Sequence, residues 1–332
     1  MKCPNCGESA GTNDRFCEGC GSNLLVTRTP EGGPLGTATT GTCVACGGTN
    51  LSADGFCEDC GRAQPGGRDR MESDLGVVTG ISDKGRRRAR NEDSMAFGTT
   101  AGENPTVVAV VCDGVATSDR AENASQRAVD EALAVMLEAA VEGKDADAAT
   151  RSAVARAIEV VTALADPSVP GTAPSCTYVS AVVTATDVTV GWVGDSRAYW
   201  LAPDGARVLT IDDTVATELV AEGMSEEQAM AVHQAHALSK WIGADAGQIE
   251  PRTLTIQPEG PGLVLLCSDG LWNYLPEPSA LVEALPGSPV DVDPTRAADE
   301  LTRVALELGG HDNITTVLVP FPPNPERTRS EG

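Results

Sequence analysis

From about residue 73, short runs rich in Val and Thr alternate with amphipathic segments. The runs are typical of β-strands and lie at 75–82, 107–112, 176–186, 188–193, 197–201, 263–268 and 315–319. Three further segments carry apolar residues at the three- and four-residue spacing of a helix. Their apolar positions, which we expect in the core, are Val129, Leu133, Met136, Leu137 and Ala140; Val154, Ile158 and Val161; and Leu301, Val304, Ala305 and Leu308.

The order of these elements predicts antiparallel sheets covered by helices. Strand candidates such as 176–186 and 188–193 form hairpin-like pairs, and long helical segments precede or follow them. This order favours an α+β fold over a doubly wound parallel sheet. We expect the domain that contains these elements to span residues 73–322.

The N-terminal part contains two copies of one cysteine motif. The copies, at 3–21 and 43–61, read C-x2-C, ten residues, C-x2-C, with Gly after the second and fourth Cys. In a chain without a secretory signal, such cysteines are better explained as metal ligands than as disulfides. Four thiolates on two tight turns suit tetrahedral Zn²⁺. The predicted zinc ligands are Cys3, Cys6, Cys17 and Cys20 in the first copy and Cys43, Cys46, Cys57 and Cys60 in the second.

Each copy resembles a zinc ribbon, and we expect the ribbons to occupy residues 1–24 and 43–62. The segments 25–42 and 63–72 are polar and aperiodic or rich in Gly, Pro and Thr, which is typical of flexible linkers. The last residues, 323–332, have few apolar groups to bury, which predicts a disordered tail.

The charge of the chain argues against nucleic acid and membrane surfaces as partners. It has 48 acidic and 24 basic residues and a net charge of −24, which repels phosphate backbones and anionic lipids. The second ribbon is itself acidic, so contact with a protein partner is favoured over nucleic acid. The longest apolar runs, 107–112 and 263–267, are too short to cross a bilayer, and no signal-peptide pattern is present. We therefore expect a cytoplasmic monomer.

Acidic residues follow several of the predicted strands. Asp113, Asp195 and Asp269 each follow an apolar run, and Asp312 lies just before the last strand. One Asp-Gly after a strand is usually only a turn. Strands of a sandwich end at a shared rim, however, where several carboxylates repel one another unless a cation lies between them. Oxygen ligands favour Mg²⁺ or Mn²⁺ over zinc.

Six motifs occur in an order that resembles the PPM family of metal-dependent Ser/Thr protein phosphatases, also called type 2C. The resemblance covers roughly residues 73–320. It implies a four-layer α/β/β/α sandwich with two Mn²⁺ or Mg²⁺ ions in the cleft between the central sheets. The motifs are SDKGRRRARNED (82–93), VVCDGV (110–115), AENAS (121–125), VGDSRAY (193–199), CSDGLW (267–272) and HDNIT (311–315).

The resemblance also implies which residues bind the ions. Asp113 would bridge both metals, and the Gly114 carbonyl would complete the first site. Asp269 and Asp312 would complete the second site, and Asn313 would support it from behind.

The loop at residues 84–93 would bind both the substrate and water. Glu92 and Asp93 would hold metal-bound waters. Arg88 matches the family spacing R-x-x-x-E-D, and its planar guanidinium would grip the phosphate through paired hydrogen bonds. The remaining cations are expected to be solvated or to steer the substrate, and they are Lys84, Arg86, Arg87 and Arg90.

Four positions depart from the family pattern. The segment after Gly114 reads VATSDRAENAS rather than a Gly-rich loop, and no His follows Gly114. Metal-bound water would then protonate the leaving group. Ala173 stands where bacterial relatives often carry an Asp that binds a third metal, so we expect that third site to be weak or absent. Asp213 stands where relatives often have His.

The expected function is hydrolysis of phosphoserine and phosphothreonine monoesters by direct attack of a metal-bridging hydroxide. The substrates would be phosphoproteins of a Ser/Thr kinase, and the zinc ribbons would bind an unknown protein partner for targeting or regulation. The alternative is a pseudophosphatase scaffold that binds partners through its ribbons. The altered loop and Ala173 favour the alternative, whereas Asp113, Asp269, Asp312 and Arg88 oppose it. The acidic charge opposes a third hypothesis, a zinc-ribbon protein that binds nucleic acid.

Overall fold

The computed structural model describes residues 3, 6–11, 14–21, 23–33, 43, 46–52, 56–61, 67–166, 168, 172–203 and 205–324. The strands are β1 (Val26–Arg28), β2 (Arg70–Asp74), β3 (Thr79–Asp83), β4 (Ser94–Thr100), β5 (Val107–Cys112), β6 (Ser175–Cys176), β7 (Tyr178–Val183), β8 (Val188–Val193), β9 (Arg197–Ala202), β10 (Gly205–Val208), β11 (Ile242–Gly243), β12 (Arg252–Ile256), β13 (Gly262–Cys267) and β14 (Ile314–Phe321). The helices are α1 (Ala121–Val141), α2 (Ala146–Thr162), α3 (Val215–Ala221), α4 (Glu226–Met230), α5 (Asp269–Trp272), α6 (Pro278–Ala284) and α7 (Pro294–Glu307).

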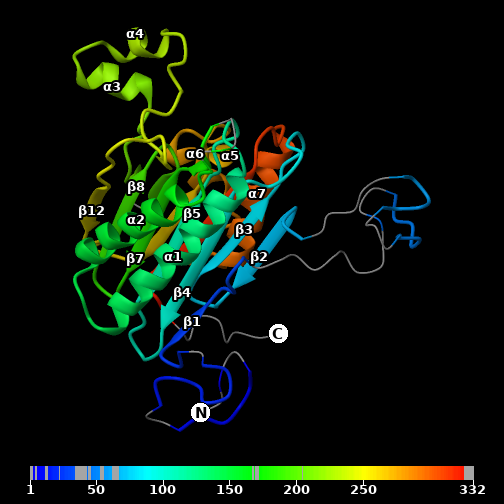
Figure 1. Cartoon of the computed structure of the whole chain (residues 1–332), viewed down its shortest axis with the longest axis vertical. Helices are drawn as coiled ribbons and strands as arrows, with labels where there is room; N and C mark the ends of the chain where they lie inside the picture. Colours follow the sequence, from blue (N-terminus) through cyan, green and yellow to red (C-terminus); the bar gives the residue numbers. More distant parts are fainter. Residues whose placement is uncertain are drawn as a thin grey trace.

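Within these residues, the strands form two six-stranded antiparallel sheets and one short strand pair, β11 with β6. The first sheet has the order β1-β4-β5-β7-β8-β12, and the second has the order β10-β9-β13-β14-β3-β2. Helices α1 and α2 cover the outer face of the first sheet, while α6 and α7 pack on the second (Figure 1). The sequence prediction of a four-layer α+β sandwich is therefore confirmed.

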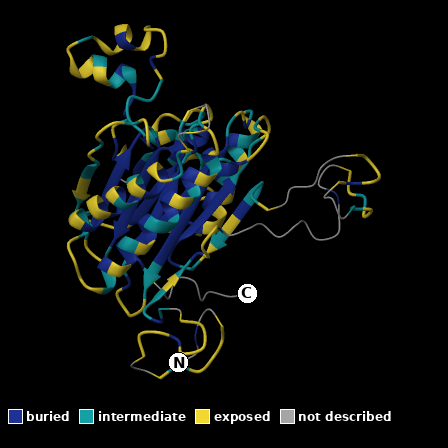
Figure 2. Ribbon diagram, in the orientation of Figure 1, coloured by how far each residue is buried: buried dark blue, intermediate teal, exposed yellow. Residues whose placement is uncertain are grey.

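Three hydrophobic cores separate the four layers. β5 shows how one strand serves two of them, because successive side chains of a strand point to opposite faces. Val107, Ala109 and Val111 belong to the core between the sheets. Val108, Val110 and Cys112 pack under α1 and α2. A strand buried on both faces reads as a continuous apolar run, and Figure 2 shows both sheets as the buried interior of the domain.

Two expected linkers contribute strands, so those boundaries were wrong. Val26–Arg28 forms β1, which pairs with the edge of β4, and Arg70–Asp74 forms β2 on the edge of the second sheet. Both are short and mostly polar, since an edge strand buries little, and they carry no periodic apolar signal. The parts of the predicted linkers and tail at 34–42, 63–66 and 325–332 lie outside the described residues.

Other differences have similar causes. The sequence prediction missed β4, β10, β12 and the shorter helices. In β12 the side chains of Arg252–Ile256 are partly exposed, which weakens the hydrophobic pattern. Leu308 is 54% exposed and not in the core, because α7 ends at Glu307 and Leu308 lies beyond its last turn.

A flap, here defined as residues 214–239, projects from one end of the domain (Figure 1). It contains α3 and α4 and has its own small cluster of Ala216, Ala229 and Ala235. A β-bridge between Thr214 and Leu238 joins the two ends of the flap. The flap is therefore a separate packing unit at that end of the two sheets.

None of the helices in the described part of the chain has the length and apolar character needed to cross a bilayer.

Candidate metal and phosphate site

Five aspartates from both sheets meet at one rim of the sandwich. Asp113 follows β5 and Asp195 follows β8 of the first sheet, while Asp93 precedes β4. Asp269 follows β13, and Asp312 lies two residues before β14 of the second sheet. Because neighbouring strands are antiparallel, the end of β5 lies beside the start of β4, and the end of β13 lies beside the start of β14. The topology thus brings together the acids that the sequence showed at strand ends.

Burial and mutual repulsion raise the pKa of four carboxyls of this group, those of Asp93, Asp113, Asp195 and Asp269. Desolvation, followed by the charge of Asp93, raises the pKa of Asp113 well above its usual range. Desolvation is also the main cause that raises the pKa of Asp93 to about 6 and that of Asp269 to about 8. The pKa of Asp195 rises to about 7, through desolvation and the charge of Asp212. Such a cluster of buried like charges is typical of a cation site.

Two buried carboxylate oxygens of this cluster have no hydrogen-bond partner. They are Oδ1 of Asp93 and Oδ1 of Asp269. The other oxygen of Asp93 accepts hydrogen bonds from Ser268 Oγ and Thr315 Oγ1, both at 2.7 Å. An unpartnered buried oxygen is costly, and a hard cation would compensate it. These residues therefore fit Mg²⁺ or Mn²⁺ by the chemistry of their donors.

Arg88 lies at the same rim, paired with Asp312. Its Nε donates to Oδ1 at 2.6 Å, and its Nη2 donates to Oδ2 at 2.5 Å. Arg88 keeps about a third of its side chain exposed, at 36%, so it is accessible to a ligand from solvent. The pairing draws Asp312 toward Arg88, next to the other acids.

Asn313 holds the loop that carries Arg88. Its Oδ1 accepts from the N–H of Glu92 at 2.8 Å, and its Nδ2 donates to the carbonyls of Lys84 and Arg90 at 2.8 and 3.0 Å. At the start of this loop, Gly85 adopts a φ of +75°, and a β-carbon there would lie 2.1 Å from the Asp312 carbonyl oxygen. The loop is thus fixed against the strand that follows Asp312.

Gly114 and Glu92 lie side by side. A β-carbon at Gly114 would lie 2.7 Å from the Glu92 carbonyl oxygen, so only glycine fits this approach. The Glu92 side chain is partly exposed, and desolvation raises its pKa although Arg88 lowers it. At the position expected for a ligand of a third metal, the methyl side chain of Ala173 has no oxygen to offer.

The other cations of the loop differ in their surroundings. Lys84 binds Asp69 at 2.7 Å, and Arg90 binds Glu122 at 3.0 Å. Arg86 and Arg87 are exposed. Among the five cations of this loop, all of them described, only Arg86 and Arg87 have no side-chain ion pair.

Asp213 connects the base of the flap to the rim. Its buried carboxylate lies 3.2 Å from Lys240 Nζ and 2.8 Å from Arg252 Nη2. It also accepts from the N–H of Gly194, the residue before Asp195, at 3.1 Å. A carboxylate at this position is therefore balanced by two cations that the sequence pattern alone did not connect with it.

The eight cysteines gather in two quartets, as the spacing predicts. In the described part of the chain, the donor atoms of each quartet lie within 4.8 Å of one another, and no other group of three or more His, Cys, Asp or Glu donors does so. The quartets are Cys3, Cys6, Cys17 and Cys20, and Cys43, Cys46, Cys57 and Cys60. The aspartates at the rim are spaced more widely.

Both the N-terminal cysteine motifs and the domain that follows them match known protein families. Residues 83–304 match the family model of protein phosphatase 2C, and residues 3–61 match that of the double zinc ribbon. The serine/threonine phosphatase stp of Listeria innocua is 30% identical over 241 residues, which cover 72% of this chain and 93% of that protein. The serine/threonine protein phosphatase PstP of Mycobacterium tuberculosis is 31% identical over 246 residues, which cover 71% of this chain and 43% of PstP.

Solved structures share the fold. The crystal structure of the Mycobacterium tuberculosis phosphatase PstP/Ppp matches with a TM-score of 0.58 and 26% identity, covering 74% of this chain and 97% of that one. A crystal structure of the PstP catalytic domain in complex with two manganese ions matches with a TM-score of 0.57 and 27% identity, with the same coverage of each chain. The chain belongs to the protein phosphatase 2C family, and a double zinc ribbon precedes its phosphatase domain.

Proposed function

We propose that the protein is a metal-dependent Ser/Thr protein phosphatase that hydrolyses phosphoserine and phosphothreonine monoesters with two Mn²⁺ or Mg²⁺ ions. The observation that carries this proposal is the group of raised-pKa aspartates, two with unpartnered buried oxygens, directly beside Arg88. The stp and PstP relatives are named as serine/threonine phosphatases, and the PstP catalytic domain has been solved in complex with two manganese ions.

The residues of the rim divide the work between metals and substrate. Asp113 would bridge the two ions, the Gly114 carbonyl would complete one site, and Asp269 and Asp312 would complete the other. Glu92 and Asp93 would contact the ions through water. When bound, the ions supply a hydroxide nucleophile near neutral pH and neutralise the charge of the phosphoryl oxygens.

Arg88 would hold the phosphate for attack. Its fork now grips the two oxygens of Asp312 and matches two oxygens of a phosphate equally well. Asn313 keeps the loop of Arg88 in register with Glu92 through three hydrogen bonds. The substrate phosphate would therefore replace the Asp312 carboxylate on Arg88, beside the metals.

The test is hydrolysis of a small aryl phosphate and a phosphothreonine peptide, with and without Mn²⁺. We expect turnover only with the metal, and we expect Asp113→Asn to reduce it by more than the roughly 10–100-fold typical of an outer-shell residue. A folded wild-type protein that binds the phosphopeptide but never releases phosphate would establish the pseudophosphatase alternative, which the non-glycine loop after Gly114 and Ala173 favour.

The zinc ribbons would serve targeting or regulation through contact with a protein partner. Support comes from the two cysteine quartets and from the net charge of −24, which disfavours nucleic acid.

A further inference from the structure

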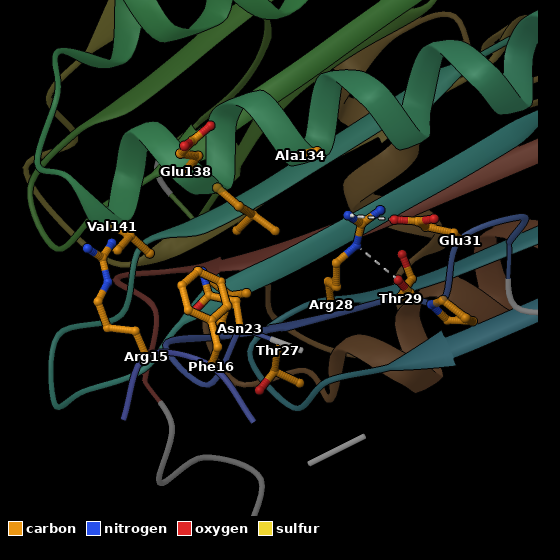
Figure 3. Close-up of a pocket in the computed structure, with 13 residues that line it drawn as sticks. Arg15, Phe16, Asn23, Thr27, Arg28, Thr29, Glu31, Ala134, Glu138 and Val141 are labelled. Atoms are coloured by element: carbon orange, nitrogen blue, oxygen red, sulfur yellow. Dashed lines mark hydrogen bonds and ion pairs between the residues drawn. The ribbon is translucent and has the colours of Figure 1, made fainter. Parts of the chain in front are cut away.

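The segment that follows the first ribbon is built into the edge of the phosphatase domain. We call residues 26–33 the strap. Its first part, β1, pairs with β4 from Val26↔Thr100 to Arg28↔Gly98. Thr29 is 1% exposed, and its N–H donates to the Phe97 carbonyl at 2.9 Å. A cavity of about 620 Å³ separates the ribbon from the C-terminal half of α1, and Figure 3 shows the strap residues on its wall.

The strap binds the side chain of Asp130 on α1. The N–H of Gly32 donates to Asp130 Oδ2 at 3.0 Å, and Arg28 Nη2 lies 3.9 Å from Oδ1. Gln126, one helical turn earlier, donates to the same Oδ2 at 3.1 Å. Gly33 has a φ of +85°, and a β-carbon there would lie 3.1 Å from Gln126 Oε1. The backbone of the strap therefore lies directly against Gln126 and Asp130.

Gln126 in turn holds Arg68, which reaches the metal site. Gln126 Oε1 accepts from Arg68 Nη1 at 2.6 Å. Arg68 Nη2 donates to the backbone carbonyl of Asp93 at 2.7 Å and to Ser94 Oγ at 2.8 Å. Glu92, the residue before Asp93, is also held in place, because Ser125 Oγ donates to its backbone carbonyl at 2.5 Å. A continuous chain of hydrogen bonds thus runs from the strap to the backbone of Asp93.

The backbone at Asp93 decides where its carboxylate points. The side chain is completely buried, with one oxygen fixed by Ser268 and Thr315 and the other unpartnered in the acid cluster. Because buried side chains cannot readjust freely, a small shift of this backbone would move the unpartnered oxygen. Metal sites depend on such supporting contacts for affinity.

We propose that Arg68 is a positioning residue that orients Asp93 for metal binding, and that the strap holds Arg68 through Asp130 and Gln126. The inference rests on the proposed function, in which Asp93 serves the metal site. Arg68 lies between the residues that match the double zinc ribbon, 3–61, and those that match the phosphatase family model, 83–304, and it is the strap after the first ribbon that holds it. The first ribbon would then contribute to catalysis as an intramolecular brace.

The test measures Mn²⁺ affinity of the full chain with zinc in its ribbons, by the electron paramagnetic resonance signal of free Mn²⁺. We expect Arg68→Met to weaken Mn²⁺ binding about tenfold. Arg68→Lys, which keeps the charge and a single donor nitrogen, should lie between that variant and wild type. The matched control is Arg151→Met, because Arg151 also bonds three groups, Asp147, Thr253 and the Pro251 carbonyl, on the far side of the domain.

The melting temperature without Mn²⁺ separates positioning from folding. Arg68→Met with a lower melting temperature but Mn²⁺ affinity within twofold of wild type would overturn the inference. If that variant does not fold, Arg68→Lys supplies the same comparison. Wild-type protein that binds no Mn²⁺ would instead overturn the proposed function itself.

A double-mutant cycle tests the strap. Asp130→Asn removes the charge that Gly32, Arg28 and Gln126 bind, and we expect it to weaken Mn²⁺ binding by about two- to threefold. In the Arg68→Met background, Asp130→Asn should have no further effect, since the route to Asp93 is already broken. Losses that multiply in the double variant would show that the strap does not act through Arg68.

Discussion

The guanidinium of Arg88 and the carboxylate of Asp312 form a two-point ion pair, with Nε–Oδ1 and Nη2–Oδ2 distances of 2.6 and 2.5 Å. In the proposed function, one partner binds phosphate and the other binds a metal ion. Both roles require the pair to open. The pair is therefore a competitor of both ligands, and it also keeps two charged groups from being unpaired at the rim.

Arg88→Ala should separate these two effects. We expect kcat/KM for a phosphothreonine peptide to fall about 10–100-fold, since a hydrogen bond to a charged group contributes about 1.5–3 kcal/mol. Mn²⁺ binding should become tighter, because Asp312 no longer has to leave Arg88. Steady-state kinetics and Mn²⁺ titration give the two values.

The control is Arg87→Ala, which removes an equal charge from the exposed neighbour. If Arg87→Ala tightens Mn²⁺ binding as much as Arg88→Ala does, the general charge of the loop is responsible and the pair is not a competitor.

The protein without its catalytic metals should lose stability as the pH rises from about 4 to about 8. Folding raises the pKa of Asp93 to about 6 and that of Asp269 to about 8, through desolvation first. Between the ordinary value of 3.8 and these values, the folded protein binds protons that the unfolded chain has lost. This stability is fully present below pH 4 and disappears through pH 6–8.

Mn²⁺ should therefore stabilise the protein more at pH 8 than at pH 5. At about 100 times its Kd, one bound ligand adds about 2.7 kcal/mol, which raises the melting temperature of a domain of this size by roughly 5–10 °C. Calorimetry of zinc-loaded protein with and without Mn²⁺ measures this. If the melting temperature without Mn²⁺ rises from pH 5 to pH 8, the assignment of these aspartates to the metal site is contradicted. An equal dependence of the melting temperature on pH in Asp269→Asn would contradict it too.

Gly85→Ala should destabilise the protein by more than about 2 kcal/mol. A left-handed φ alone costs about 1–2 kcal/mol for a residue with a β-carbon, and at Gly85 that carbon would also lie 2.1 Å from the Asp312 carbonyl oxygen. Gly143→Ala is the matched control, because Gly143 has a similar φ of +67° with no atom within 4 Å of a β-carbon. Chemical denaturation of the two variants gives the difference, and equal losses would show that the close approach to Asp312 costs nothing.

The two ribbons should differ in their effect on the phosphatase site. Cys17→Ser and Cys57→Ser remove equivalent buried ligands, and each should lower zinc from two ions per chain to one. Cys17 packs with Leu24, two residues before the strap begins. We therefore expect Cys17→Ser to weaken Mn²⁺ binding about two- to threefold and Cys57→Ser to leave it unchanged. Zinc released to a chromogenic chelator gives the stoichiometry, and equal Mn²⁺ affinities would contradict the difference.

The sequence was informative where structure is encoded locally. The run 107–112 is apolar because β5 is buried on both faces, and Asp113 follows it directly, so both strand and acid were visible. The cysteine quartets were visible for the same reason, since their spacing alone defines two tight turns. Asp195 was visible at its strand end, but only the topology brings it near Asp269.

Contacts between distant segments left no such pattern. Arg68 lies in a polar stretch, and its partners Asp93 and Gln126 are 25 and 58 residues away. Thr29 bonds to Phe97, 68 residues away, and it directly follows a strand of three residues that is too short to show a period. Asp213 is buried and forms ion pairs with Lys240 and Arg252, which come from later segments of the chain. Each of these depends on pairing across the domain rather than on neighbours in the chain.

The pairing of β1 with β4 also affects which fragments of this protein stay monomeric in solution. A polypeptide that begins at residue 67 would keep the other strands of both central sheets, but β4 would become an exposed edge strand. Its backbone N–H and C=O groups, those of Phe97 among them, would then be open to a second molecule. Free strand margins of this kind are templates for self-association. The strap thus covers the edge strand of the first sheet, and fragments meant to stay monomeric at high concentration should begin before Val26.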